Sequence, residues 1–161
     1  WAICWILFAL CVHKVHNFLA FANARCLTIS QFLPTFAVMN TIINIKQRSE
    51  ICVGALADNL ERLLSRGRVV VITDANIDRL YHPLVERFEH IIIGSGETNK
   101  TLQTVENIYR QLMAMGADRS TFLLGIGGGI VTDITGFVAA TYMRGVEFGF
   151  VSTTLLGAVD A

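Results

Sequence analysis

Three consecutive glycines, Gly127 to Gly129, interrupt the apolar run FLLGIGGGIVTDITGF, and a single acid, Asp133, follows them. Glycine weakens a strand and a helix alike, so a bare backbone at this point needs a reason. The apolar residues before the glycines predict a strand, and those after them predict a helix. Backbone amides at such a turn approach an anion without a Cβ atom in the way, and the helix dipole favours negative charge. The pattern therefore predicts a binding site for a pyrophosphate.

The common phosphate-binding patterns fit this turn only in part. A GxGxxG pattern that starts at Gly125 needs a glycine where the sequence has Ile130. A Walker A loop needs a lysine and a serine or threonine that are missing here. A glycine triplet by itself is explained more simply by a tight packing turn, so the functional interpretation depends on residues elsewhere in the chain.

Polar residues also follow three other predicted strands. In an open parallel sheet, ligands bind outside the carboxyl ends of the strands. Each such residue alone is usually a helix cap or a solvated loop residue. Agreement among four strand ends nevertheless favours a nucleotide site. The residues are Asp74 and Asn76 after the first strand, Glu97 and Lys100 after the second, and Thr153 and Thr154 after the third.

The elements that must position these residues alternate along the chain from Met39 onward. Apolar runs predict strands, and apolar residues three and four positions apart predict the helices between them. Repeated strand and helix units favour an α/β fold with an open, mostly parallel sheet and helices on both faces. The predicted strands are 39–47, 49–54, 68–73, 90–94, 121–126 and 148–154, and the predicted helices are 56–64, 77–88, 102–115 and 130–143.

Residues 1–38 differ from the rest of the sequence. The apolar run 1–12 is shorter than the roughly 20 residues that span a bilayer, and no basic segment precedes it as in a signal peptide. We therefore predict a domain over 39–161 that begins at Met39, with residues 1–38 as upstream translated sequence or a poorly packed extension. An interfacial membrane anchor is the alternative, although no basic face accompanies the apolar one.

The totals exclude several classes of protein. A length of 161 residues suits one domain, and 13 basic against 13 acidic side chains leave no basic patch for nucleic acid. The cysteines form no CxxC pair and are interpreted as reduced thiols of a cytoplasmic protein, and the histidines have no metal-ligand spacing. The cysteines are Cys4, Cys11, Cys26 and Cys52, and the histidines are His13, His16, His82 and His90.

Four segments between about Met39 and Ala161 resemble the amino-terminal, NAD-binding domain of 3-dehydroquinate synthase. They are TDANI, SGETNKT, LGIGGGIVTDITGFVAATYMRGVEF and STTLLGAVDA, of which the third and the last are specific in combination. Residues 1–38 take no part in the resemblance. It implies a Rossmann-like domain whose C-terminal helical partner, with the Glu and two His ligands of a zinc or cobalt ion, is absent from this chain.

The resemblance also implies a role for each candidate residue. The residues implied for the adenosine half of NAD are Asp74, Asn76, Glu97 and Lys100, and those for the pyrophosphate are Gly127, Gly128 and Gly129. The rest of the cofactor is assigned to Asp133, Thr153, Thr154 and Asp160. The substrate is assigned to Arg144 and Asp160. A surface cation at a helix end is the alternative for Arg144.

The activity that the resemblance implies is a step of the shikimate pathway. NAD oxidises a hydroxyl of 3-deoxy-D-arabino-heptulosonate 7-phosphate, phosphate is eliminated, the hydride returns, and ring closure gives 3-dehydroquinate. We expect this chain to be a fragment that binds NAD weakly and does not complete the reaction alone. The full-length protein is expected to be a cytoplasmic homodimer that acts on a sugar acid phosphate, not on nucleic acid or membrane.

Two alternatives stay open. One is a related sugar phosphate cyclase or, more distantly, a metal-dependent glycerol or alcohol dehydrogenase; the pair Gly157 and Ala158 departs from the family pattern and leaves the cyclase subgroup undecided. The other is a non-catalytic nucleotide-binding or oligomerisation module.

Overall fold

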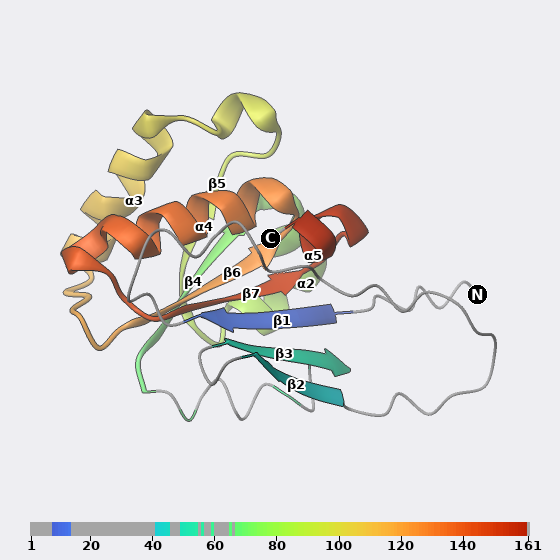
Figure 1. Cartoon of the computed structure of the whole chain (residues 1–161). Helices are drawn as coiled ribbons and strands as arrows, with labels where there is room; N and C mark the ends of the chain where they lie inside the picture. Colours follow the sequence, from blue (N-terminus) through green and yellow to red (C-terminus); the bar gives the residue numbers. More distant parts are fainter. Residues whose placement is uncertain are drawn as a thin grey trace.

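One sheet organises the chain. The structure, a computed structural model, describes residues 8–13, 41–45, 49–54 and 67–160 together with positions 56, 59 and 65. In this part of the chain seven strands lie in the order β2-β3-β1-β7-β6-β4-β5 (Figure 1). The strands are β1 (Phe8–His13), β2 (Thr41–Ile45), β3 (Ser49–Gly54), β4 (Val69–Asp74), β5 (Glu89–Ile93), β6 (Phe122–Gly127) and β7 (Phe148–Ser152).

Helices connect the strands of the second half of the sheet. They are α2 (Ala75–Val85), α3 (Leu102–Ala114), α4 (Gly129–Thr141) and α5 (Leu155–Asp160), with the short 3-10 helices η2 (Glu97–Asn99) and η3 (Tyr142–Arg144). Strands β7, β6, β4 and β5 pair in parallel with one another. The predicted α/β fold is thus confirmed in these four strands.

Both faces of the parallel strands are covered, and β4 shows why. Val70 and Ile72 belong to one buried cluster with residues of α3 and α4, whereas Val69 and Val71 belong to a second cluster with residues of α2. Successive side chains of a strand point to opposite faces, so a strand covered on both sides must be apolar throughout. This requirement explains the unbroken run VVVI in the sequence.

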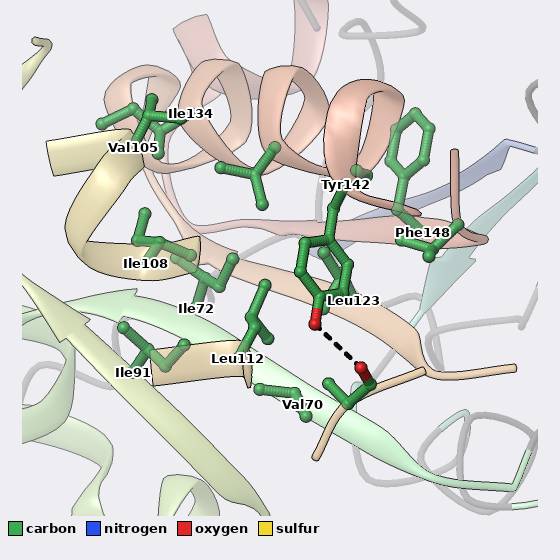
Figure 2. Packing of buried hydrophobic residues seen from close by; sticks show 14 of the residues in the cluster. Val70, Ile72, Ile91, Val105, Ile108, Leu112, Leu123, Ile134, Tyr142 and Phe148 are labelled. Carbon is green, nitrogen blue, oxygen red and sulfur yellow. Dashed lines mark hydrogen bonds between the residues drawn. The ribbon is translucent and has the colours of Figure 1, made fainter. Parts of the chain in front are cut away.

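The larger cluster lies between the sheet and the helices α3 and α4 (Figure 2). Tyr142 is a buried tyrosine of this cluster at the end of α4. Its hydroxyl group donates to the carbonyl oxygen of Ala117 at 2.8 Å. A buried hydroxyl without a partner destabilises a core, and this bond removes that cost. Tyr142 therefore fastens the end of α4 to the segment that leads into β6.

The other half of the sheet is antiparallel. Strand β1 lies between β3 and β7 and pairs antiparallel with both, while β2 pairs antiparallel with β3. The predicted strands at β2 and β3 are confirmed, but β1 falls within residues 1–38, where we predicted no strand. A short apolar run with polar residues after it is as typical of a strand as of a membrane element. The boundary of the domain at Met39 stays a prediction.

Two helices end earlier than predicted, for identifiable reasons. Helix α2 ends at Val85 rather than at residue 88, after a kink at Tyr81 (φ −128°, ψ 27°) and with Pro83 inside its last turn. Helix α4 ends at Thr141 because Tyr142 has an extended ψ of 130°, and Met143 then has a φ of 48°. The predicted helix over 56–64 lies mostly outside the described residues. No helix in the described part of the chain is long and apolar enough to cross a membrane.

Candidate functional site

Strands β4 and β6 are parallel neighbours, but the helices that follow them lie on opposite faces of the sheet. Helix α2 follows β4 onto one face of the sheet, and α4 follows β6 onto the other face. A crevice forms at the carboxyl ends of two such strands, and this is where open α/β sheets bind ligands. The buried hydroxyl of Thr73 donates to the carbonyl oxygen of Ile126 at 2.8 Å and ties the two strand ends together. The predicted residues Asp74 and Gly127 are the last residues of these strands.

The predicted glycine turn joins β6 to α4. Gly128 is the N-cap of α4, and no side chain caps it. The first turn closes when the amide of Val131 donates to the carbonyl oxygen of Gly128 at 3.0 Å. The amides of Gly129 and Ile130 come before that bond, at positions where a helix supplies no partner of its own. The turn thus offers backbone donors at a positive helix end, which suits an anion.

The three glycines serve different purposes. None has a positive φ, so conformational freedom does not require them. A Cβ atom at Gly127 would lie 2.5 Å from Cγ2 of Val131, so glycine is needed there for packing. A Cβ at Gly128 would lie 3.3 Å from Cγ2 of Thr154, which is tight, whereas a Cβ at Gly129 would meet nothing within 4 Å. Only Gly129 leaves open space that packing does not explain.

Helix α5 begins against this turn. The amide of Thr153 donates to the carbonyl oxygen of Gly127 at 2.9 Å, and Oγ1 of Thr154 accepts from the amide of Gly157 at 3.1 Å. A Cβ at Gly157 would lie only 3.1 Å from the backbone nitrogen of Gly129. The structure therefore brings Thr153 and Thr154 to the glycine turn as predicted. It also adds Gly157, which sequence reasoning noted only as a departure from the family pattern.

Asp74 is a helix cap. Its Oδ1 atom accepts from the amides of Asn76 at 2.8 Å and Ile77 at 3.1 Å, which makes it the N-cap of α2. The side chain is half-buried, and Asn76 beside it is exposed. A carboxylate has two oxygens, so the Oδ2 atom of Asp74 leaves acceptor capacity for a further donor. Both residues lie at the carboxyl end of β4, beside β6.

An ion pair connects the loop after β5 to helix α4. The Nζ atom of Lys100 lies 2.7 Å from Oδ2 of Asp133 and 3.8 Å from Oε1 of Glu97. All three side chains are exposed to a large extent. Asp133 stands one turn beyond Gly129 on α4, so the structure brings these three predicted residues to the same end of the sheet as the glycine turn.

Of the remaining predicted residues, Arg144 lies away from this group, and the position of the Asp160 side chain is not described. Arg144 follows the C-terminal end of α4, and a 13-residue helix is about 20 Å long. Figure 1 shows α4 running along the strands, with its two ends at opposite ends of the sheet, so Arg144 is far from Gly128 within this chain. Its φ of 70° follows the 48° of Met143, and both side chains are exposed. Asp160 is the last residue of α5, and its side chain lies outside the described part of the chain.

The structure describes the side chains of two histidines, His82 and His90, and of one cysteine, Cys52. Nδ1 of His82 lies 3.0 Å from Oδ1 of Asp78 on the exposed side of α2, and Nδ1 of His90 lies 3.0 Å from the carbonyl oxygen of Phe88. Cys52 is buried. Within the ranges that the structure describes, no group of three histidine, cysteine or acidic residues is placed to hold a metal ion.

The family described as 3-dehydroquinate synthase N-terminal matches residues 90–161, which include the loop after β5, the glycine turn and α5. Residues 90–161 are thus similar to this family. The match covers Glu97, Lys100, Asp133 and both threonines of the site. Asp74 and Asn76 lie upstream of it.

Curated relatives extend the likeness upstream of residue 90. The 3-dehydroquinate synthase of Pyrococcus furiosus is 44% identical over 104 residues, which are 61% of this chain and 31% of that protein. The 3-dehydroquinate synthase of Ruminiclostridium cellulolyticum is 38% identical over 133 residues, which are 74% of this chain and 37% of that protein. The chain thus spans about a third of the length of the curated 3-dehydroquinate synthases that it matches.

A solved structure of a sugar phosphate cyclase shares the fold. The crystal structure of a 2-deoxy-scyllo-inosose synthase superposes with a TM-score of 0.52 at 26% identity, over 58% of this chain and 29% of that chain. A 2-deoxy-scyllo-inosose synthase complexed with carbaglucose-6-phosphate, NAD+ and Co2+ gives a TM-score of 0.47 at 30% identity, over 55% and 28% of the two chains. The first superposition supports the open α/β fold of this chain.

Proposed function

We propose that this chain is the nucleotide-binding part of a 3-dehydroquinate synthase and binds NAD across the carboxyl ends of β4 and β6. The observation that carries the proposal is the uncapped N-terminus of α4, where Gly129 leaves open space in front of backbone amides. Its position at the divergence of α2 and α4 is the usual place for a dinucleotide in this architecture. The similarity of residues 90–161 to the 3-dehydroquinate synthase N-terminal family supports the proposed activity.

The surroundings of the turn support a division of the cofactor among the elements. The amides after Gly128 suit the pyrophosphate, since a doubly negative group gains from the helix dipole. Asp74, Asn76 and Glu97 offer oxygen and amide groups on the side of β4 and β5, where the adenosine half would lie. Lys100 and Asp133 stand above the turn, and Thr153 and Thr154 border it from β7.

When bound, NAD would supply reversible hydride transfer for the proposed conversion of 3-deoxy-D-arabino-heptulosonate 7-phosphate to 3-dehydroquinate with loss of phosphate. The residues of this chain bind the cofactor and fix its orientation. A divalent metal, zinc or cobalt, is implied by the resemblance, but the described residues provide no ligand set for it. We assign no step to a metal within this chain. A cytoplasmic homodimer stays a prediction.

Calorimetric titration of NAD into the 161-residue chain tests the proposal, with Gly129→Ala as the decisive variant. The added methyl group meets no protein atom within 4 Å, and alanine is the better helix former, so the variant should fold as well as the wild type. Its NAD affinity should fall by about tenfold or more, because the methyl group stands where the phosphates approach the amides.

Asn107→Ala, on the exposed side of α3, is the matched control and should bind NAD as the wild type does. Equal affinity for NAD in the wild type and Gly129→Ala would remove the cofactor from this turn. If NAD bound neither to the wild type nor to any variant, the result would count against the proposed function as a whole.

A related sugar phosphate cyclase is the second candidate, since a 2-deoxy-scyllo-inosose synthase shares the fold at 26% identity. The two candidates use the same kind of nucleotide site and differ in the sugar phosphate. Turnover of a heptulosonate 7-phosphate but not of a hexose 6-phosphate by the intact natural protein would decide for 3-dehydroquinate synthase.

A further inference from the structure

We propose that Asn99 is a positioning residue for the adenosine half of the nucleotide. Its side chain occupies the space beside Gly94 and thereby fixes the loop that carries Glu97 and Lys100. Asn99 itself needs no contact with the ligand. The inference rests on the proposed NAD site and adds a residue to which neither the sequence pattern nor the resemblance gives a role.

The first observation is the close fit between Asn99 and Gly94. A Cβ atom on Gly94 would lie 2.2 Å from Oδ1, 2.5 Å from Cγ and 2.7 Å from Nδ2 of Asn99. Non-bonded atoms do not approach so closely, so the carboxamide of Asn99 takes up the space that any larger residue at position 94 would need. The φ of Gly94 is not positive, and backbone freedom therefore does not account for glycine here.

The second observation is that Asn99 bonds to both sides of the loop. Its Nδ2 group donates to the carbonyl oxygen of Ser95 at 2.8 Å, and its backbone amide donates to that of Gly96 at 3.0 Å. Its own carbonyl oxygen accepts from the hydroxyl of Thr104 at 2.6 Å and from the amide of Thr101 at 2.9 Å. One residue thus joins the end of β5 to the start of α3.

The consequence concerns the residues on either side. Glu97 lies two positions before Asn99, and Lys100 directly follows Asn99. The amide of Lys100 donates to the carbonyl oxygen of Glu97 at 3.0 Å. With the loop folded in this way, Nζ of Lys100 lies 2.7 Å from Oδ2 of Asp133 on α4. The contact of Asn99 with Gly94 therefore sets the distance between the loop and the glycine turn.

A cycle of four proteins tests this role: the wild type, Gly94→Ala, Asn99→Ala and the double variant. Each is titrated with AMP, which represents the adenosine half of NAD, and with nicotinamide mononucleotide, which represents the other half. Each single substitution should weaken AMP binding by about fivefold, the equivalent of one net hydrogen bond, and leave nicotinamide mononucleotide binding within about twofold. The double variant should bind AMP no more weakly than Asn99→Ala, because the new methyl group then enters an empty space.

Asn107→Ala serves again as the control for an exposed Asn to Ala change, and hydrogen exchange of the Lys100 and Thr101 amides reports the loop without any ligand. Both amides should exchange faster in Gly94→Ala and Asn99→Ala than in the control. Additive losses in the double variant, or equal losses for the two nucleotides, would overturn the role of Asn99 while NAD binding by the wild type still supports the proposed function. A wild type that binds no NAD would overturn both.

Discussion

Lys100 and Asp133 join two separate elements of the site, with 2.7 Å between Nζ and Oδ2. The lysine follows the carboxyl end of β5, and the aspartate lies in the second turn of α4. Their side chains are 44% and 48% exposed, so water and salt reach the pair. An ion pair of this exposure contributes little to stability, and a charged ligand can compete with it.

A double-mutant cycle with Lys100→Met and Asp133→Asn measures this coupling in the free protein. We expect a coupling free energy below about 1 kcal/mol, because half-exposed pairs contribute little in water. The coupling should shrink as salt rises, since the Debye length falls from about 10 Å at 0.1 M to about 3 Å at 1 M. Urea unfolding of the four proteins at two salt concentrations provides the measurement.

The exposed pair of Glu106 and Arg110 on α3, with 2.7 Å between Oε1 and Nη2, is the matched control cycle. It should show a coupling of similar size and similar salt dependence. A coupling above about 2 kcal/mol for Lys100 and Asp133, or one that salt does not change, would contradict an open and exchangeable pair.

Gly157→Val should lower both stability and NAD affinity, in contrast to Gly129→Ala. A Cβ at position 157 would lie 2.8 Å from Oγ of Ser152 and 3.1 Å from the backbone nitrogen of Gly129. The larger side chain must push α5 away from the turn or cover the amide, and overpacking of this kind costs about 1–3 kcal/mol. Urea unfolding together with NAD titration checks both effects. Unchanged stability would show that α5 does not pack on the turn.

Tyr142→Phe tests the bond that fastens the end of α4. The variant leaves the carbonyl oxygen of Ala117 without its donor, and we expect the free energy of unfolding to fall by about 1–2 kcal/mol. Burial raises the pKa of Tyr142 above 10.0. The neutral phenol therefore stabilises the fold fully below pH 10.0, and this contribution is lost as the pH rises through the raised pKa.

Urea unfolding at neutral pH and at several values above pH 10 measures both effects. The wild type should lose stability more steeply with alkaline pH than Tyr142→Phe. Tyr81→Phe, at a half-buried ring on α2, is the control. An equal dependence on pH in the wild type and Tyr142→Phe would show that the phenol is not desolvated.

The parallel half of the fold was predictable because its signals are local. The runs VVVI in β4 and FLL in β6 are apolar at every position, as strands covered on both faces require. Strand β1 is hard to predict because its pairing with β3 and β7 is distant in sequence, and a short apolar run does not by itself distinguish a strand from other elements. The end of α2 was placed too late because the kink at Tyr81 overrides the apolar spacing.

The site was predictable at the strand ends and less so elsewhere. The rule that ligands bind at carboxyl ends of strands placed Asp74, Lys100 and the glycine turn together. Arg144 was assigned to the substrate by resemblance alone, and the length of α4 places it at the other end of that helix from the glycine turn. Asn99 gave no signal, because the space that it fills exists only once the loop folds back on Gly94.

His82 offers a test of side-chain electrostatics on α2. Its Nδ1 atom lies 3.0 Å from Oδ1 of Asp78, and its Nε2 atom lies 3.7 Å from Oε2 of Glu86. The hydrogen bond to Asp78 and then the charges of Asp78 and Glu86 raise the pKa of His82 above 6.5. The stabilisation by the imidazolium is therefore complete below pH 6.5 and is lost as the pH rises through the raised pKa. An NMR titration of the imidazole should show a midpoint above 6.5 that falls more in Asp78→Asn than in Glu86→Gln; the reverse order would assign the main interaction to Glu86.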